Sequence, residues 1–246
     1  MKKRYLVLSG LLALTLAACS QEKPATSETQ TSTEEKTVQE GTVGSKSQEA
    51  SQKKAEVVNK GDYYSVQGKY DEIVIANKHY PLSKDYNPGE NPTARQKVNK
   101  LISDAQALGL NVSNQVSGFR AYDTQAGLYN NYVASHGKQE ADRFSARPGY
   151  SEHQTGLVFD LIDNQGQLLG AEGTSESSKK AAEWLDKNAH KYGFIVRYKP
   201  QFVEKTGYME ESWHIRYVGE DVAKTIYEKN ISLEEYLNAP GGDYAN

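Results

Sequence analysis

From residue 61 onward, the spacing of apolar and polar residues predicts short strands and amphipathic helices. A helix is predicted over 92–108, because its apolar residues recur every three or four positions and Gly109 follows as a stop signal. Alternating or short apolar runs bounded by turn residues predict the strands. Further helices are expected over 123–137, 177–192 and 220–229, with a last one capped by Ser232 and Glu235, and strands over 72–76, 110–119, 156–162, 167–169, 194–198 and 213–218.

The order of these elements indicates the fold class. Helices cluster early and late around the short strands, without the strict strand–helix alternation of a doubly wound sheet. We therefore expect an α+β fold built on a small antiparallel sheet with flanking helices.

The first residues have the pattern of a lipoprotein signal peptide. Residues 2–4 are basic, residues 5–16 are apolar but too few to span a membrane, and the run ends in Leu-Ala-Ala followed by Cys19. An ordinary signal peptide with an incidental cysteine is the alternative. We expect cleavage after residues 1–18 and lipidation of Cys19, which would anchor the protein because more than one acyl chain is attached.

The next segment, residues 19–60, is predicted to be a disordered tether. It contains no aromatic residue and is dominated by Ser, Thr, Gln, Glu, Lys and Ala. Such a composition cannot bury enough apolar surface to offset the entropy of ordering. The remaining residues, 61–246, are enough for one domain with a sizeable core.

Composition and charge exclude several classes of function. The 246 residues carry a net charge of -3, which argues against nucleic acid as a partner, since such proteins present a basic stripe. The single cysteine excludes an intramolecular disulfide framework and every cysteine-rich zinc motif.

Two of the five histidines are candidates for a metal site. Asp160 lies in an apolar strand pattern, where a carboxylate is costly unless it is paired or binds a metal. His153 precedes it by seven residues, an odd separation that requires the chain to bend, and Gly156 offers a place to do so. His214 begins a later apolar strand, and Glu211 lies three residues before it. Two histidines, one carboxylate and a water form a catalytic zinc arrangement, although a histidine on a strand is more often a core or surface residue than a metal ligand.

Separated sequence blocks resemble the zinc D-alanyl-D-alanine carboxypeptidases of the VanY-like family, and the resemblance covers roughly residues 92–218. The blocks are, in chain order, Ser117-Gly118-Phe119-Arg120-Ala121-Tyr122 with Gln125, Ser151-Glu152-His153, Gly156-Leu157 with Asp160, and Glu211-x-Trp213-His214. Phe119 replaces the usual tyrosine, and Val158-Phe159 replaces Ala-Val; both changes keep the strands apolar.

The resemblance implies a metal centre and a catalytic base. It implies that His153, Asp160 and His214 bind Zn²⁺ and that Glu211 is the general base. It also implies the small α+β fold of the hedgehog and D-Ala-D-Ala peptidase type, so that residues 61–246 would form a zinc peptidase domain.

Further residues are assigned to the substrate by the same resemblance. Arg120 is expected to act in catalysis by facing the substrate carbonyl or its terminal carboxylate, and Gln125 and Ser151 are expected to line the substrate cleft. The role of Arg147 is left open: it is either an ion partner behind the site or a substrate contact.

A different catalytic class has to be weighed. Lys205-Thr206-Gly207 matches a motif of serine penicillin-binding enzymes, and Ser51-x-x-Lys54 and Ser177-x-x-Lys180 match their Ser-x-x-Lys. Ser51 lies in the predicted tether, and no Ser-Asp-Asn stands between Lys180 and Lys205, so the serine mechanism is disfavoured.

The function implied by the family is peptidoglycan remodelling. We expect a monomeric zinc L,D-carboxypeptidase, similar to the streptococcal lipoprotein type, that removes D-alanine from tetrapeptide stems at the extracellular face of the bacterial cytoplasmic membrane. The alternatives are a D,D-carboxypeptidase acting on pentapeptide stems and a lipoprotein that binds muropeptides without catalysis.

Overall fold

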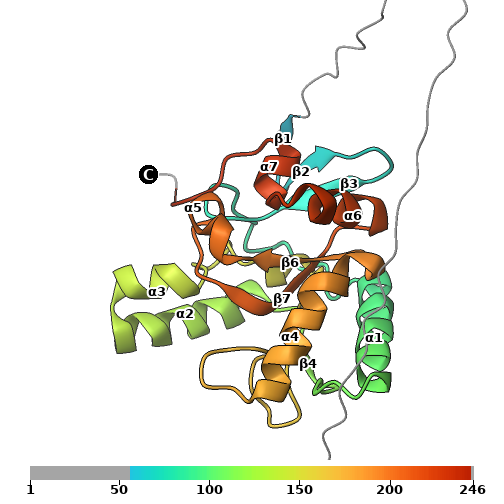
Figure 1. The fold of residues 1–246 in the computed structure, drawn as a ribbon. Helices are drawn as coiled ribbons and strands as arrows, with labels where there is room; N and C mark the ends of the chain where they lie inside the picture. The colour runs from blue at the N-terminus through green and yellow to red at the C-terminus, as the bar shows by residue number, and fades with distance from the viewer. Residues whose placement is uncertain (1–55, 245–246) are drawn as a thin grey trace, which may run out of the picture. The chain divides into compact units, whose positions relative to one another are not determined.

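The computed structural model describes residues 56–244, which form two antiparallel sheets with helices packed around them (Figure 1). The strands are β1 (Val57–Asn59), β2 (Tyr64–Gln67), β3 (Glu72–Ile75), β4 (Val116–Ser117), β5 (Val158–Leu161), β6 (Phe194–Tyr198) and β7 (Glu211–Tyr217). The α-helices are α1 (Pro92–Ala107), α2 (Tyr122–His136), α3 (Lys138–Phe144), α4 (Glu176–Asn188), α5 (Val203–Thr206), α6 (Glu220–Lys229) and α7 (Leu233–Leu237). The expected α+β class with small sheets and flanking helices is confirmed.

The larger sheet has the order β4-β5-β7-β6, and every neighbouring pair is antiparallel. Because successive side chains of a strand point to opposite faces, one face of this sheet is apolar and the other is polar. Phe159 and Ile215 lie on the apolar face, whereas Asp160 and His214 are opposite each other in the register of β5 and β7.

The apolar face of the larger sheet is covered by α1 and α4. The apolar residues of α1 from Val98 to Ala105 are buried, as their spacing predicted, and Leu101 is 0% exposed. Burial of each such side chain contributes about 1.5–3 kcal/mol. Leu108, expected on the same stripe, follows the end of the helix and is 65% exposed. Asn91 caps α1 by accepting a hydrogen bond from the backbone of Ala94, so the helix begins at Pro92, where it was predicted to begin.

The smaller sheet, β1-β2-β3, packs with α6 and α7 around a second apolar cluster (Figure 1). The capping box predicted for the last helix is present, with Ser232 and Glu235 bonded reciprocally.

β1 lies inside the range expected for the tether, so the ordered part of the chain begins earlier than residue 61. β1 forms a hairpin with β2, which composition alone did not indicate.

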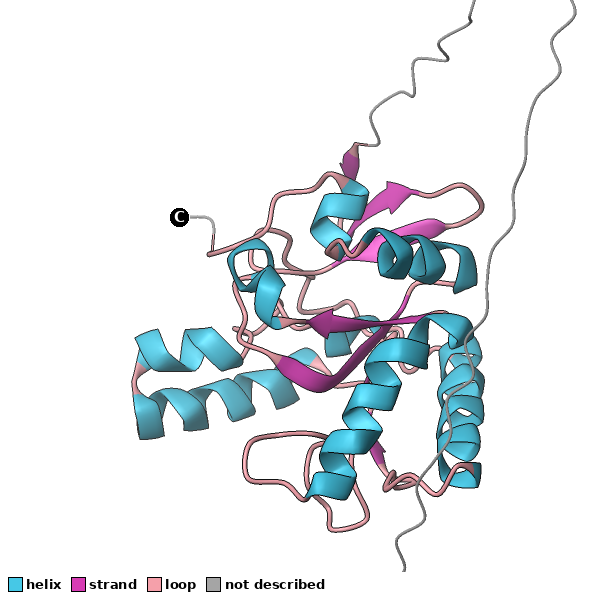
Figure 2. Cartoon of the chain, in the orientation of Figure 1, coloured by secondary structure: helices cyan, strands magenta, loops and turns pink. Residues whose placement is uncertain are grey.

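Two predicted strands are shorter than expected, and the helices α3 and α5 were not predicted. Only Val116–Ser117 of the run 110–119 is a strand, and the polar residues before it are irregular. The run 167–169 contributes a single bridge to the long loop between β5 and α4 that Figure 2 shows. After Gly137, which has a φ of 82°, the chain begins α3 and pairs it with α2.

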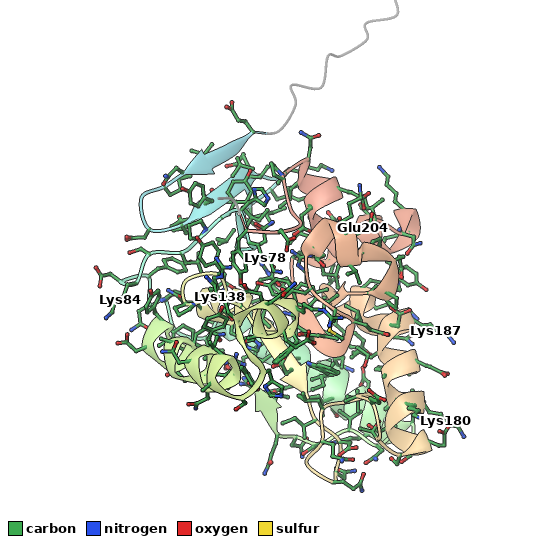
Figure 3. The ribbon with its side chains drawn as sticks, turned by 90° about the vertical axis from the view of Figure 1, so that its left-hand side faces the viewer. Lys78, Lys84, Lys138, Lys180, Lys187 and Glu204 are labelled. Carbon is green, nitrogen blue, oxygen red and sulfur yellow. The ribbon has the colours of Figure 1, made fainter. Side chains whose placement is uncertain are left out.

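The lysines show which sides of the molecule face solvent. Lys180 and Lys187 point away from α4 in Figure 3, and both are exposed. Lys78 instead is only 2% exposed and donates a hydrogen bond to the carbonyl of Gly207 at 2.6 Å. It also lies 4.8 Å from the ring centre of Tyr208, so the loop after β3 is held against the segment before β7.

Candidate active site

Three predicted metal ligands come together on the polar face of the larger sheet. His153 is on the 3-10 helix η1 (Glu152–Thr155), Asp160 on β5 and His214 on β7. One donor atom from each lies within 4.8 Å of the other two, and all three residues are buried. The antiparallel register that places Asp160 opposite His214 therefore builds most of the site.

The bend expected at Gly156 brings His153 to the strand. Gly156 ends η1 with a φ of 73°, in the left-handed region, and its N–H bonds to the carbonyl of His153. A Cβ at this position would lie 2.0 Å from the carbonyl oxygen of Gly89. The turn therefore requires glycine for its backbone angle and for its close approach to the loop before α1.

The two histidines present different ring nitrogens to the site. Nδ1 of His153 is 2.7 Å from the carbonyl of Gly118, which can only accept, so Nδ1 carries the proton and Nε2 is free. That Nε2 lies 3.1 Å from Oδ2 of Asp160. In His214 the order is reversed: Nε2 is 3.4 Å from Glu152, and Nδ1 is 3.1 Å from Oδ1 of Asp160.

This donor set fits a zinc ion. Two imidazole nitrogens and one carboxylate oxygen are a common protein contribution to a catalytic zinc site. Oδ1 of Asp160 is buried, and among residues 56–244 it faces only Nδ1 of His214, an environment that is costly for a carboxylate unless a cation binds there. Burial alone would raise the pKa of Asp160, but His153 and His214 outweigh it and hold that pKa well below its usual range.

Glu211, the predicted base, borders the same group of atoms. Its carboxylate lies 3.4 Å from Nδ1 of His214, at the start of β7. Burial raises the pKa of Glu211 to about 8, and Asp160 adds to the rise while His214 opposes it. Burial would lower the pKa of His214, but hydrogen bonds to Asp160 and Glu152 raise it to about 9.

Arg120 points toward the metal ligands and is held there by Gln125. Its guanidinium lies 3.6 Å from Oδ2 of Asp160 and donates to Oε1 of Gln125 at 2.8 Å. Gln125 is only 1% exposed, and its amide nitrogen donates to the carbonyl of Ala146. Gln125 was expected to line the cleft; its contacts place it behind Arg120, as a residue that orients the guanidinium.

The loop before η1 is braced by side chains from distant segments. Ser151, expected in the cleft, is buried at the residue that precedes η1. Arg147 pairs with Asp142 at 2.7 Å and stacks on the ring of Tyr244 at 3.8 Å. The backbone N–H of Arg147 also donates to the Tyr244 hydroxyl. These contacts make Arg147 an ion partner that supports the loop.

Sequence reasoning missed the buried ions behind His214. Glu152, Arg197 and Arg216 are each at most 1% exposed, and both arginines donate to the Glu152 carboxylate. Burial would raise the pKa of Glu152, but the two arginines outweigh it and hold that pKa well below its usual range. The signal that singled out Asp160, a charge inside an apolar strand, is also present at both arginines and would have found them.

The residues of the serine-enzyme alternative do not form a site. Ser177 is exposed on α4, where its hydroxyl contacts Asn111 and Ser175. Lys205 pairs with Glu235 on α7. Ser51, like Cys19 and the predicted signal peptide, lies outside the described residues.

Comparison with known proteins identifies relatives of this chain. The family model described as D-alanyl-D-alanine carboxypeptidase (VanY) matches residues 89–220. A D-alanyl-D-alanine carboxypeptidase from Enterococcus faecalis is 37% identical over 184 residues, which are 68% of this chain and 65% of the relative. The solved L,D-carboxypeptidase DacB from Streptococcus pneumoniae is 60% identical with a TM-score of 0.72, covering 78% of this chain and 100% of that one. A variant of the D,D-pentapeptidase VanY from a VanB-type resistance cassette, solved in complex with Zn(II), is 31% identical with a TM-score of 0.57, covering 67% and 97%.

Proposed function

Because the chain belongs to the VanY family of D-alanyl-D-alanine carboxypeptidases, we propose that it is a zinc-dependent L,D-carboxypeptidase of peptidoglycan. It removes the terminal D-alanine of a tetrapeptide stem by hydrolysing the bond between L-lysine and D-alanine. The observation that carries the L,D specificity is the 60% identity to an L,D-carboxypeptidase over the whole of that chain, against 31% to a D,D-pentapeptidase.

The main alternative is a D,D-carboxypeptidase that acts on pentapeptide stems. It is favoured by the matching family model and by the Enterococcus faecalis relative, both described as D-alanyl-D-alanine carboxypeptidases. A lipoprotein that only binds muropeptides is the weaker alternative, because the candidate metal ligands and the candidate base converge in one buried cluster.

The zinc ion would be held by Nε2 of His153, Nδ1 of His214 and an oxygen of Asp160. When bound, zinc polarises the scissile carbonyl and lowers the pKa of its water toward neutrality. The carboxylate of Glu211, beside the same donor atoms, takes the proton from the attacking water. As the C–N bond breaks, Glu211 returns this proton to the nitrogen of the departing D-alanine.

Arg120 supplies the positive charge that an anionic substrate group requires. Gln125 fixes one edge of its guanidinium, and the Arg120 side chain is 19% exposed beside Asp160. We expect Arg120 to bind the terminal carboxylate of D-alanine. Amidation of that carboxylate removes a charge-assisted hydrogen bond of about 1.5–3 kcal/mol, so kcat/KM should fall at least tenfold.

The Arg120 assignment is tested by a two-by-two comparison of enzyme and substrate. Wild type and Arg120→Ala are each assayed on the free and the amidated tetrapeptide. The variant should show little preference between the two. If wild type and variant preferred the free tetrapeptide to the same degree, Arg120 would not bind the terminal carboxylate. It would then stabilise the developing oxyanion or have a structural role.

The central experiment is mass spectrometry of purified tetrapeptide and pentapeptide muropeptides after incubation with the protein. The expected result is conversion of tetrapeptide to tripeptide, which chelation abolishes and zinc restores. Conversion of pentapeptide to tetrapeptide alone would establish the D,D alternative. Full activity after verified removal of the metal would contradict the zinc mechanism.

We also propose that the protein is a lipoprotein on the extracellular face of the cytoplasmic membrane. The basic residues 2–4, the apolar run 5–16 and Cys19 support this location. Within residues 56–244, no helix has the length and apolar character that crossing a bilayer requires. We assign the attachment to lipid on Cys19 because Leu-Ala-Ala precedes this cysteine at the end of the apolar run.

A further inference from the structure

A network of buried ions lies behind the metal-ligand cluster. Oε1 of Glu152 accepts hydrogen bonds from Nε of Arg197 at 3.0 Å and from a guanidinium nitrogen of Arg216 at 2.9 Å. Its other oxygen, Oε2, lies 3.4 Å from Nε2 of His214. Glu152 is therefore shared between two arginines and one candidate metal ligand.

The network continues away from the site to a second carboxylate. Arg197 makes a bidentate pair with Glu234 on α7, at 2.9 and 2.5 Å. Glu234 also accepts from the amide of Asn77 at 3.1 Å. Glu234 is 3% exposed, and neither its hydrogen bonds nor its ion pairs involve a candidate metal ligand.

The charges of this network balance only if Glu152 is ionised. Two guanidinium groups face two carboxylates, and isolated buried charges are costly unless each is paired. An ionised carboxylate can only accept hydrogen bonds. The ring nitrogen of His214 that faces Glu152 must therefore carry a proton, which leaves Nδ1 to face Asp160 and Glu211.

From this geometry we infer that Glu152 is a positioning residue for the metal centre, holding His214 in the Nε2–H tautomer and in the ring orientation that directs Nδ1 to the ion. The inference rests on the proposed zinc site and adds a residue to it. Carboxylates that hold a ligating histidine in this way affect metal affinity by about 10–100-fold.

The test compares two variants that lose the same charge from the same network. Glu152→Gln removes the carboxylate that faces His214, whereas Glu234→Gln removes one that does not. The free energy of unfolding of each metal-free protein is measured in urea, and zinc affinity is measured by competition with a chelator. Both variants should be less stable than wild type, because each leaves Arg197 partly unpaired.

Zinc affinity separates positioning from general stability. We expect Glu152→Gln to bind zinc about 10–100-fold more weakly than wild type, and Glu234→Gln to stay within about threefold. Unchanged zinc affinity in Glu152→Gln, or equal weakening in both variants, would overturn the inference.

A second measurement needs no variant and covers the case in which Glu152→Gln does not fold. In wild type labelled with ¹⁵N-histidine and loaded with zinc, NMR should show the His214 proton on Nε2 and the metal on Nδ1. The opposite arrangement would overturn the inference. If wild type bound no zinc, that result would contradict the proposed function but not the role of Glu152. The tautomer of neutral His214 in the metal-free protein would then decide whether Glu152 holds the proton on Nε2.

Discussion

At the scale of single residues, the site depends on which atom of each side chain is left free. His153 gives its Nδ1–H to the carbonyl of Gly118, and His214 faces Glu152 with Nε2. The remaining nitrogens both lie 3.1 Å from oxygens of Asp160. Two residues of one type thus serve the same centre through different atoms, because their hydrogen-bond partners differ.

The first prediction concerns Glu211. Glu211→Gln keeps the size of the side chain and removes its ability to take a proton, so turnover should fall by at least about 10²–10⁴-fold. Zinc content and the free energy of unfolding should change little, because Glu211 is not among the three candidate ligands. Steady-state kinetics with metal analysis checks this, and near wild-type turnover would place the base elsewhere.

The second prediction concerns pH and the pair of Asp142 with Arg147. Burial alone would raise the pKa of Asp142, but hydrogen bonds from Arg147 and Tyr129 outweigh it and lower that pKa. A lowered pKa stabilises the fold above the unfolded value of about 4, and this contribution is lost as pH falls through the folded value. Asp142→Asn should therefore cost about 1–3 kcal/mol at pH 7 and less at about pH 3.

Urea unfolding at the two pH values measures that difference. Glu140→Gln is the matched control on α3, because Glu140 pairs with Arg143 at the exposed surface. Its effect should stay below about 1 kcal/mol at either pH. A penalty for Asp142→Asn that does not change with pH would show that the charge of Asp142 is not what stabilises the loop.

At the scale of elements, the site is made where η1 turns into β5. The turn at Gly156 ends η1 three residues after His153 and leads into β5, so that helix and strand contribute ligands to the same point. Since β7 pairs with β5 in fixed register, any shift of the turn would move His153 relative to both other ligands.

The third prediction follows from that turn. Gly156→Ala places a Cβ against the carbonyl of Gly89 at a φ that L-residues rarely adopt, so it should cost more than about 1 kcal/mol and weaken zinc binding. Gly127→Ala, on the open surface of α2, should stabilise by about 0.5–1 kcal/mol with unchanged zinc affinity. Urea unfolding and zinc titration of both variants test this. Similar effects of the two substitutions would refute the role of the turn.

At the scale of the whole molecule, distant segments are joined through buried polar contacts. Asn77, after the smaller sheet, bonds to Glu234 on α7, and Lys78 bonds to Gly207 before β7. Arg216 of the larger sheet donates to the carbonyl of Val74 in β3. The two sheets therefore unite around the ions behind the metal site, and we expect residues 56–244 to unfold cooperatively.

The fourth prediction concerns the attachment of the whole protein. Cys19→Ala removes the proposed lipidation site, so the protein should leave the membrane fraction while its carboxypeptidase activity is unchanged. Fractionation followed by immunoblotting measures this, with Ser20→Ala as the control. A Cys19→Ala protein that still sediments with membranes after a high-salt wash would show that another attachment holds it.

The sequence by itself was sufficient for features that depend on local pattern. The burial of most of the α1 stripe and the capping box at Ser232 follow from residue spacing, and the order of the elements indicates the α+β class. The family was identified from the resemblance of separated motif blocks. Asp160 was singled out because a charge in an apolar strand requires a partner or a metal. The full set with His153, His214 and Glu211 was implied by the resemblance of the separated blocks to the family.

Tertiary structure decided what those residues contact. The pairing of β5 with β7 joins segments more than fifty residues apart, and no local pattern specifies its register. The same is true of Gln125, which was expected in the cleft but lies behind Arg120, and of Glu152, which reaches Arg197 and Arg216. Hydrogen bonds and ion pairs act over a few ångströms in space, so the partner of a buried polar group is settled only when the chain has folded.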